Sequence, residues 1–458
     1  MKAALLFAKD DIRVQDIPRP EIGEGEILLQ TASASICGTD IRMLKHGHPY
    51  ATPEKPLVIG HEMAGVIAEV GAGVRSFRPG QRVCIAPNYN PVSSRLVVSG
   101  EGHLDTGYRA LGIHEHGAFA EFVRIPRDAV LQGNVFAIAD HVSFAAAALV
   151  EPLACVYNAY EKARTGPGDT VLIIGAGPIG LMHAKISKMA GAGKVIVNDV
   201  NPDRLAIARQ LDASFITIVG DPGSELEKLT GGQGADVIIT ACPVAAMQTR
   251  AIELAAINGR VIFFGGLPKG ASVVPLDTNI IHYKQLLVTG TTRQSLRHFQ
   301  KTLDLISSGV IEVENLITST HSIAEAKAAI TQAMAMAHRI RNTARWMRAS
   351  PTINAPTAPA TIHWGNSPDA NRANRTNQDG DAAVALIHRK RLVSISGIAR
   401  ATVKARTCSL HAPHYRRIKA GPPPHGEPKP AAGRSAMTAV GSGAGGQGKP
   451  RGVPAQSG

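Results

Sequence analysis

The sequence predicts an α/β protein with a β-rich N-terminal region, a doubly wound parallel sheet and a disordered basic tail. The N-terminal region, residues 1–150, contains strand-like runs such as 26–36 (EILLQTASASI) and 82–87 (RVCIAP), separated by Gly and Pro. From about residue 165, strand-like runs alternate with helix-like runs. This alternation is typical of a parallel sheet with helices on both faces.

The alternating elements follow one another along residues 170–290. The strand-like runs are 170–177 (TVLIIGAG), 194–200 (KVIVNDV), 235–242 (ADVIITAC), 260–266 (RVIFFGG) and 285–290 (QLLVTG). The helix-like runs between them are 178–192, 202–211 and 245–257, and two more follow at 295–309 and 322–337. The last of these begins with Ser322 and Glu325, at the spacing of a helix capping box.

Composition limits the function classes. No uninterrupted apolar run of about 18 residues occurs, so we expect no membrane span. The five cysteines are scattered and odd in number, which favours a reducing cytoplasm over a disulfide framework. The net charge of +13 lies mainly after residue 348, where 15 Lys and Arg face 4 Asp and Glu. The basic pI therefore says little about the folded part.

A glycine-rich turn between a strand and a helix predicts a dinucleotide site. Gly175, Gly177 and Gly180 form a G-x-G-x-x-G pattern, and Asp199 ends the next strand. Such a turn lets the backbone approach a pyrophosphate at the helix N-terminus. An acid at this place accepts from the ribose hydroxyls and repels a 2′-phosphate, which favours NAD over NADP. The expected cofactor contacts are Gly175, Gly177, Pro178, Ile179, Gly180, Asp199 and Arg204.

Two polar residues interrupt an apolar, glycine-rich run at 57–71 (LVIGHEMAGVIAEVG). These are His61 and Glu62, and Cys37 and Glu151 occupy comparable places near apolar segments. Thiolate, imidazole and carboxylate are the ligands of a catalytic Zn²⁺ with one open position. Each residue alone also fits a plain structural role, as a core cysteine, a buried histidine or a surface carboxylate. A shared metal would explain why polar groups are buried here.

Five motifs carry a resemblance to a known family. They are CGTD (37–40), GHEMAGVIAEVGAGV (60–74), PGQRV (79–83), EPLACV (151–156) and GAGPIG (175–180). With them, residues 1 to about 345 resemble the zinc-dependent medium-chain dehydrogenases, and the His-Glu pair resembles their polyol and L-threonine 3-dehydrogenase branch. The resemblance implies Cys37, His61 and Glu62 as zinc ligands and Glu151 as a direct or water-mediated ligand.

The resemblance also implies the domain plan. Residues 1–153 would form a GroES-like β-barrel catalytic domain, completed by about 290–348, and residues 154–289 a Rossmann NAD-binding domain. Residues 349–458 hold 12 of the 29 prolines and would be a disordered tail. We expect the catalytic fold to need nothing beyond about residue 348. Relatives of this kind are commonly homodimers or homotetramers.

The implied reaction is oxidation of an alcohol, with zinc activating the hydroxyl and NAD accepting hydride. Thr39 would take the alcohol proton. Relatives often carry a histidine three residues later to pass this proton on, but Arg42 stands there and cannot act as a base. We therefore take His46 as the substitute candidate.

A second departure concerns the structural zinc that many relatives hold in a lobe. The four expected cysteine positions correspond here to Pro91, Ser94, Val97 and Asp105. None is a cysteine, so we expect one catalytic zinc and no structural zinc.

Three functions remain in competition. The first is a zinc- and NAD-dependent dehydrogenase of polyols or sugar alcohols, with L-threonine as the alternative substrate. A zinc-free reductase is disfavoured because it has no reason to keep Cys37, His61, Glu62 and Glu151 together. A polyanion-binding protein acting through the tail is disfavoured because the tail contains no recognisable nucleic-acid-binding module.

Overall fold

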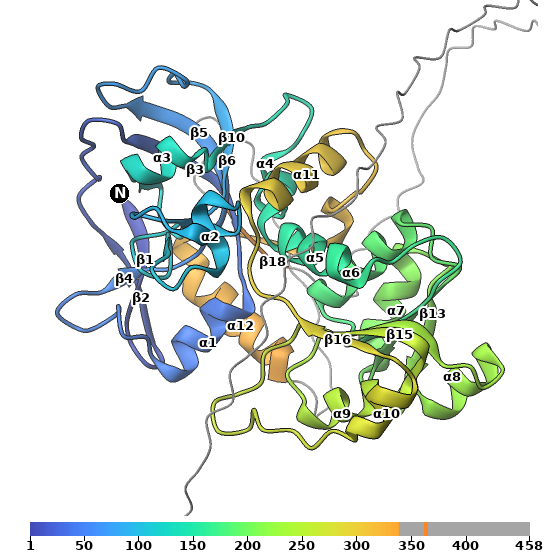
Figure 1. Ribbon diagram of the computed structural model, residues 1–458. Coiled ribbons are helices and arrows are strands. Elements are labelled where there is room, and N and C mark those ends of the chain that lie inside the picture. The colour runs from blue at the N-terminus through green and yellow to red at the C-terminus, as the bar shows by residue number, and fades with distance from the viewer. Residues whose placement is uncertain (339–360, 365–458) are drawn as a thin grey trace, which may run out of the picture. The chain divides into compact units, whose positions relative to one another are not determined.

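The computed structural model describes residues 1–338 and 361–364 (Figure 1). The N-terminal part forms an antiparallel sheet in the order β2-β1-β4 and a larger sheet built around β3 and β5. Its strands are β1 (Lys2–Ala8), β2 (Asp11–Asp16), β3 (Ile27–Ser35), β4 (Leu57–Val58), β5 (Glu62–Val70), β6 (Arg82–Ile85), β7 (Asn88–Tyr89), β8 (Arg109–Ala110), β9 (Phe122–Ile125) and β10 (Val135–Ala137). Its helices are α1 (Gly38–His46), α2 (Arg95–Val98), α3 (Arg127–Gln132), α4 (Phe144–Ala148) and α5 (Val150–Ala163).

The second part is the predicted parallel sheet. Its six strands lie in the order β13-β12-β11-β14-β15-β16, with every neighbouring pair parallel. The strands are β11 (Thr170–Ile174), β12 (Lys194–Asp199), β13 (Ile216–Val219), β14 (Ala235–Thr240), β15 (Ala255–Phe263) and β16 (Leu287–Gly290). The helices are α6 (Pro178–Met189), α7 (Pro202–Leu211), α8 (Gly223–Thr230), α9 (Ala245–Leu254) and α10 (Thr278–Tyr283). The strand order reverses between β11 and β14, where ligands of such sheets bind.

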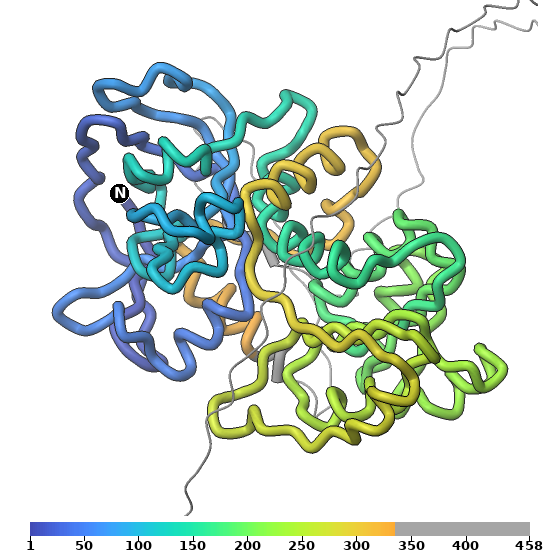
Figure 2. Tube along the Cα trace, in the orientation of Figure 1, coloured from blue at the N-terminus to red at the C-terminus, as the bar shows by residue number. Residues whose placement is uncertain are grey.

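After the parallel sheet the chain returns to the N-terminal part (Figure 2). The elements are α11 (Leu296–Ser307), β17 (Ser319–Ser322) and α12 (Ala326–His338). Ile330 and Ala333 of α12 share one buried cluster with Ala3 and Leu6 of β1. The predicted capping box is confirmed, because Glu325 accepts from the backbone N–H of Ser322 at 2.9 Å. Helix α12 thus completes the core of the N-terminal part.

A short strand lies beyond residue 348. It is β18 (Thr361–Trp364), which pairs parallel with β3 and antiparallel with β17 in the larger sheet. This sheet therefore extends past the limit expected from the sequence. Residues 339–360 and 365–458, which include the rest of the predicted tail, lie outside the described residues. Within the described ranges, no helix is long and apolar enough to cross a membrane.

Candidate active site

The first two site residues are placed by a strand end and a helix start. Cys37 follows β3 and is the N-cap residue of α1. Its backbone N–H donates to Asp40 Oδ2 at 2.8 Å, while Asp40 Oδ1 lies 3.5 Å from Nδ1 of His61. One fully buried carboxylate thereby orients both the cysteine backbone and the imidazole ring.

His61 and Glu62 are turned inward by the glycine before them. Gly60 has φ +94°, and a Cβ there would lie 2.5 Å from the Phe119 ring, so only glycine fits. Glu62 then opens β5 and accepts a hydrogen bond from the hydroxyl of Ser35 on the paired strand β3. The sequence motif therefore places two polar side chains inside an otherwise apolar barrel wall.

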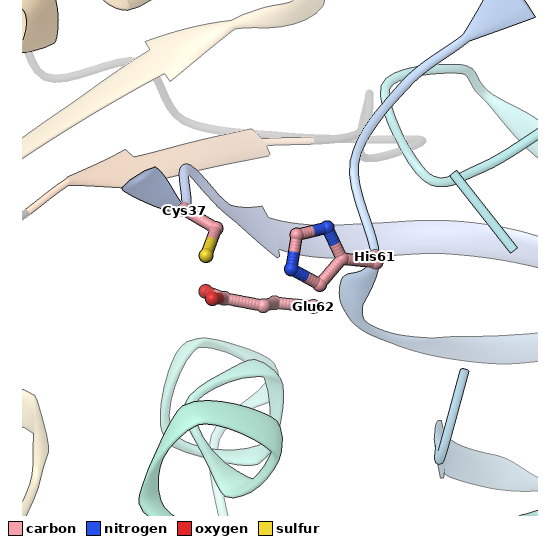
Figure 3. A group of neighbouring side chains, drawn as sticks. All are labelled: Cys37, His61 and Glu62. Carbon is pink, nitrogen blue, oxygen red and sulfur yellow. The ribbon is translucent and has the colours of Figure 1, made fainter. Parts of the chain in front are cut away.

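The three predicted ligand residues meet in space. The donor atoms of Cys37, His61 and Glu62 all lie within 4.8 Å of one another (Figure 3). Zinc–ligand bonds measure about 2.0–2.3 Å, so two ligand atoms on opposite sides of one ion lie about 4.0–4.6 Å apart, slightly less than this 4.8 Å limit. Nδ1 of His61 faces the Asp40 carboxylate, and the other ring nitrogen, Nε2, points toward Cys37 and Glu62 (Figure 3). The donor set is the one that zinc takes, and a small inward shift of the side chains would bring all three within reach of one ion.

Burial and mutual charge shift the pKa of each of these groups. Burial raises the pKa of the Cys37 thiol, and the Glu62 carboxylate adds to the rise. Burial and the nearby Glu151 carboxylate raise the pKa of Glu62 to about 7. Burial opposes the charged form of His61, but the negative charges of Cys37 and Asp40 outweigh it and hold its pKa well above the ordinary value. A divalent cation would replace these protons as the compensating positive charge.

Glu151 comes from a different element. It lies in the first turn of α5, beside Pro152, where a missing N–H costs no helix hydrogen bond and an acid faces the positive end of the helix dipole. Its side chain is buried and burial raises its pKa. Glu151 is not within the 4.8 Å cluster, yet it is near enough to raise the pKa of Glu62.

The predicted proton-relay residues are not joined. Thr39 lies in the first turn of α1, and its hydroxyl accepts from Arg42 Nη2 at 3.1 Å. His46 ends the same helix and is exposed. His46 lies seven positions after Thr39, or about 10 Å along the helix axis, so no direct hydrogen bond joins them. Its relay role stays a prediction.

The glycine-rich turn lies at the carboxyl end of β11, as the pattern predicts. Gly177 caps α6, with Pro178 and Ile179 in its first turn, and a Cβ on Gly180 would lie 1.8 Å from the carbonyl oxygen of Gly175. This close packing leaves room only for glycine.

Asp199 faces this turn from the end of β12. Its Oδ2 accepts from the backbone N–H of Ala176 at 2.8 Å and lies 3.5 Å from Arg204 Nη1. Asp199 and Arg204 are therefore next to the turn, on the neighbouring strand and helix.

Two residues beside Glu151 were not predicted. Gln294 Nε2 donates to Glu151 Oε1 at 2.9 Å, and Cys155 Sγ donates to Gln294 Oε1 at 3.0 Å. Gln294 lies 143 residues from Glu151 and belongs to no motif. Cys155, four residues after Glu151, could have been found as its neighbour on one face of a helix.

In the lobe, hydrogen bonds join three of the positions at which relatives carry cysteines. Ser94 caps α2, and its hydroxyl accepts from the backbone N–H of Val97 at 3.3 Å. The same hydroxyl donates to Asp105. The single-zinc expectation stays a prediction.

Comparisons with known proteins agree with this geometry. Residues 23–135 match the alcohol dehydrogenase GroES-like domain, and residues 178–308 match the zinc-binding dehydrogenase domain. Sorbitol dehydrogenase of Bacillus subtilis (strain 168) is 30% identical over 341 residues, covering 73% of this chain and 94% of that protein. The chain belongs to the zinc-dependent medium-chain dehydrogenase family.

Two further relatives help to limit the function of this dehydrogenase. L-threonine 3-dehydrogenase of Chelativorans sp. (strain BNC1) is 32% identical over 326 residues, covering 69% of this chain and 91% of that protein. A structure from Sinorhizobium meliloti 1021, described as a zinc-binding dehydrogenase bound to NADP, superposes with a TM-score of 0.67 at 29% identity. It covers 80% of this chain and 99% of that one. This dehydrogenase therefore acts on CH–OH groups, as its named relatives do.

Proposed function

We propose that this dehydrogenase oxidises a secondary hydroxyl of a polyol or sugar alcohol, with one zinc ion at Cys37, His61 and Glu62 and with NAD as hydride acceptor. The observation that carries the proposal is the buried thiol, imidazole and carboxylate cluster within 4.8 Å. When bound, the zinc supplies a Lewis acid that lowers the pKa of the substrate hydroxyl. The 30% identity to a sorbitol dehydrogenase supports the polyol class.

The residues of this chain have separate tasks around that ion. Asp40 faces Nδ1 of His61 at 3.5 Å, which leaves Nε2 as the ligand nitrogen. Ser35 holds one oxygen of Glu62, which leaves the other oxygen free to bind. Thr39, two residues after Cys37, offers a hydroxyl that takes the alcohol proton and passes it outward.

NAD is proposed as the cofactor because of Asp199. A 2′-phosphate on the adenosine ribose would meet the Asp199 carboxylate, and two like charges in contact are unfavourable. The NADP-bound relative makes this a point to measure, since Arg204 lies 3.5 Å from the same carboxylate and is a cation that a phosphate could pair with.

L-threonine is the second candidate substrate, favoured by the 32% identity to an L-threonine 3-dehydrogenase. The polyol and L-threonine candidates are distinguished by measuring NADH formation from sorbitol, xylitol, galactitol and L-threonine under matched conditions. We expect the highest kcat/KM with a polyol. Turnover of L-threonine alone would replace the polyol proposal, and turnover of none of the four would reject both.

We also propose a cytoplasmic location and a homo-oligomeric assembly. The scattered, odd number of cysteines supports a cytoplasmic enzyme. The family resemblance supports a homodimer or homotetramer. Fractionation and sedimentation of the full chain test these two points.

A further inference from the structure

We infer that Gln294 is a positioning residue for Glu151, held in its working orientation by Cys155. The inference rests on the proposed zinc site. It concerns three side chains outside the ligand cluster, of which Glu151 and Gln294 are buried and Cys155 is partly buried. Glu151 and Cys155 come from α5, whereas Gln294 comes from the segment between β16 and α11.

Gln294 occupies one oxygen of Glu151. Its Nε2 donates to Glu151 Oε1 at 2.9 Å, so Oε1 is engaged by an amide and Oε2 is the oxygen left for the metal or its water. A carboxylate held in this way acts through one oxygen. Hydrogen bonds of this kind orient the ligands of metal sites.

Cys155 sets which way the amide faces. Its thiol donates to Gln294 Oε1 at 3.0 Å, and the same sulfur lies 3.9 Å from Glu151 Oε1. If the amide were reversed, its carbonyl oxygen would face the carboxylate and its NH₂ would face the thiol hydrogen. The carbonyl and carboxylate acceptors would then be opposed and the thiol would lose its acceptor at 3.0 Å, so both neighbours favour the orientation that serves Glu151.

The backbone around Gln294 is fixed from the same helix. Asn158 is buried on α5, and its Nδ2 donates to the carbonyl of Arg293 at 2.9 Å and to that of Thr292 at 3.4 Å. Glu151, Cys155 and Asn158 are spaced by four and three residues, which places them on one face of the helix. That face therefore receives both the backbone of the segment and the side chain of Gln294.

Arg293 also holds the segment that carries Gln294 in place. It has φ +55°, an uncommon conformation for a residue with a side chain. Its guanidinium lies 3.9 Å from the centroid of the Tyr108 ring and also donates to the carbonyl of His103. Arg293, the residue before Gln294, thus ties this segment to the N-terminal domain, and Gln294 contacts Glu151. The segment has little freedom to move away from the site.

The test measures the zinc dissociation constant of the full chain by competition with a chromogenic chelator. We expect Gln294→Leu to weaken zinc binding by about 10–100-fold, the usual effect of losing a partner of a metal ligand. Gln294→Glu keeps the shape of the side chain but places a second carboxylate against Glu151. Its loss of zinc affinity relative to the wild type should therefore grow as the pH rises and shrink when the introduced carboxyl group is protonated. This variant also serves if Gln294→Leu does not fold.

Two further variants test the thiol. Cys155→Ala should weaken zinc binding, and Cys155→Ser, which keeps a donor, should recover most of that loss. Cobalt-substituted Gln294→Leu should show a changed absorption spectrum, because the ligand field reports on the ligands themselves. The matched control is Gln300→Leu, which removes an exposed amide–carboxylate hydrogen bond of 2.8 Å to Asp304 and should leave zinc binding unchanged.

The outcomes separate the inference from the proposed function. Wild-type zinc affinity, pH dependence and cobalt spectrum in both Gln294 variants would overturn the inference alone. A wild-type chain that binds no zinc would overturn the proposed site and the inference with it. A lower melting temperature of the Gln294 variants with unchanged zinc affinity would also overturn the inference about Gln294.

Discussion

Arg42 donates a hydrogen bond of 3.1 Å from its Nη2 to the hydroxyl oxygen of Thr39. The hydroxyl keeps its own hydrogen and one lone pair, so Thr39 can still exchange a proton with a substrate oxygen. Arg42 stabilises negative charge on that oxygen but cannot carry the proton further, because a guanidinium does not deprotonate in proteins. The proton must then leave through water or a histidine.

This pair leads to a first prediction about the relay. Thr39→Val should lower kcat by about 10²–10⁴-fold, the usual contribution of a positioned proton-transfer group, and Thr39→Ser should restore most of it. His46→Ala should cause a smaller loss that added imidazole recovers. An unchanged kcat in His46→Ala would show that the relay ends at water, and an unchanged kcat in Thr39→Val would remove Thr39 from it.

The second prediction concerns cofactor choice. Asp199→Ala removes the charge that opposes a 2′-phosphate and also the acceptor for the N–H of Ala176. The ratio of kcat/KM for NAD to that for NADP should therefore fall by at least about tenfold, or about 1.4 kcal/mol. Initial rates with each cofactor measure it. A wild-type enzyme that already prefers NADP would contradict the assignment.

The third prediction is an acid sensitivity built into α6. His183 is buried against the ring of Phe264, and burial lowers its pKa to about 3. Below about pH 6.5 the unfolded chain therefore binds a proton that the folded chain does not. Stability from this residue is fully present above about pH 6.5 and falls by about 1.4 kcal/mol per pH unit down to about pH 3.

His183→Leu should remove that part of the acid sensitivity. Chemical denaturation of the metal-free enzyme at about pH 7 and about pH 5 measures the difference in unfolding free energy. The variant should lose less stability over this interval than the wild type. His282→Leu is the control, since this residue is exposed on α10 of the same domain. Equal losses in wild type and His183→Leu would contradict the burial argument.

The fourth prediction concerns β18. The strand pairs at four positions with β17 and at three with β3, so a chain ending at residue 348 leaves both edges unpaired. Each net hydrogen bond contributes about 0.5–1.5 kcal/mol, so this chain should melt several degrees below one ending at residue 366. Identical melting temperatures and activities would restore residue 348 as a sufficient end point.

Sequence patterns predicted the parts of the site that are local. Gly60, His61 and Glu62 lie in one motif, and the structure buries both polar side chains beside Cys37. The glycine-rich turn and Asp199 are joined by one strand–helix–strand unit, so their spacing carries the geometry.

Contacts between distant segments could not be predicted in the same way. Gln294 reaches Glu151 only because α5 and the segment before α11 pack together, and the sequence shows no sign of that pairing. β18 is likewise a contact between distant segments, since it pairs with β3 and β17. Asp40 belongs to the CGTD motif, but the motif does not show that Asp40 faces the His61 ring. That contact depends on how the later segment with His61 packs against α1.

The central claim is that Cys37, His61 and Glu62 hold one zinc ion per chain. The most direct measurement is metal analysis of the purified full chain beside Cys37→Ala, with Cys84→Ala, a buried β6 cysteine that is not among the three ligand residues, as a control. We predict one zinc in the wild type and in Cys84→Ala, and none in a folded, inactive Cys37→Ala. Two tightly bound zinc ions in the wild type, or one retained with full activity in Cys37→Ala, would contradict the account.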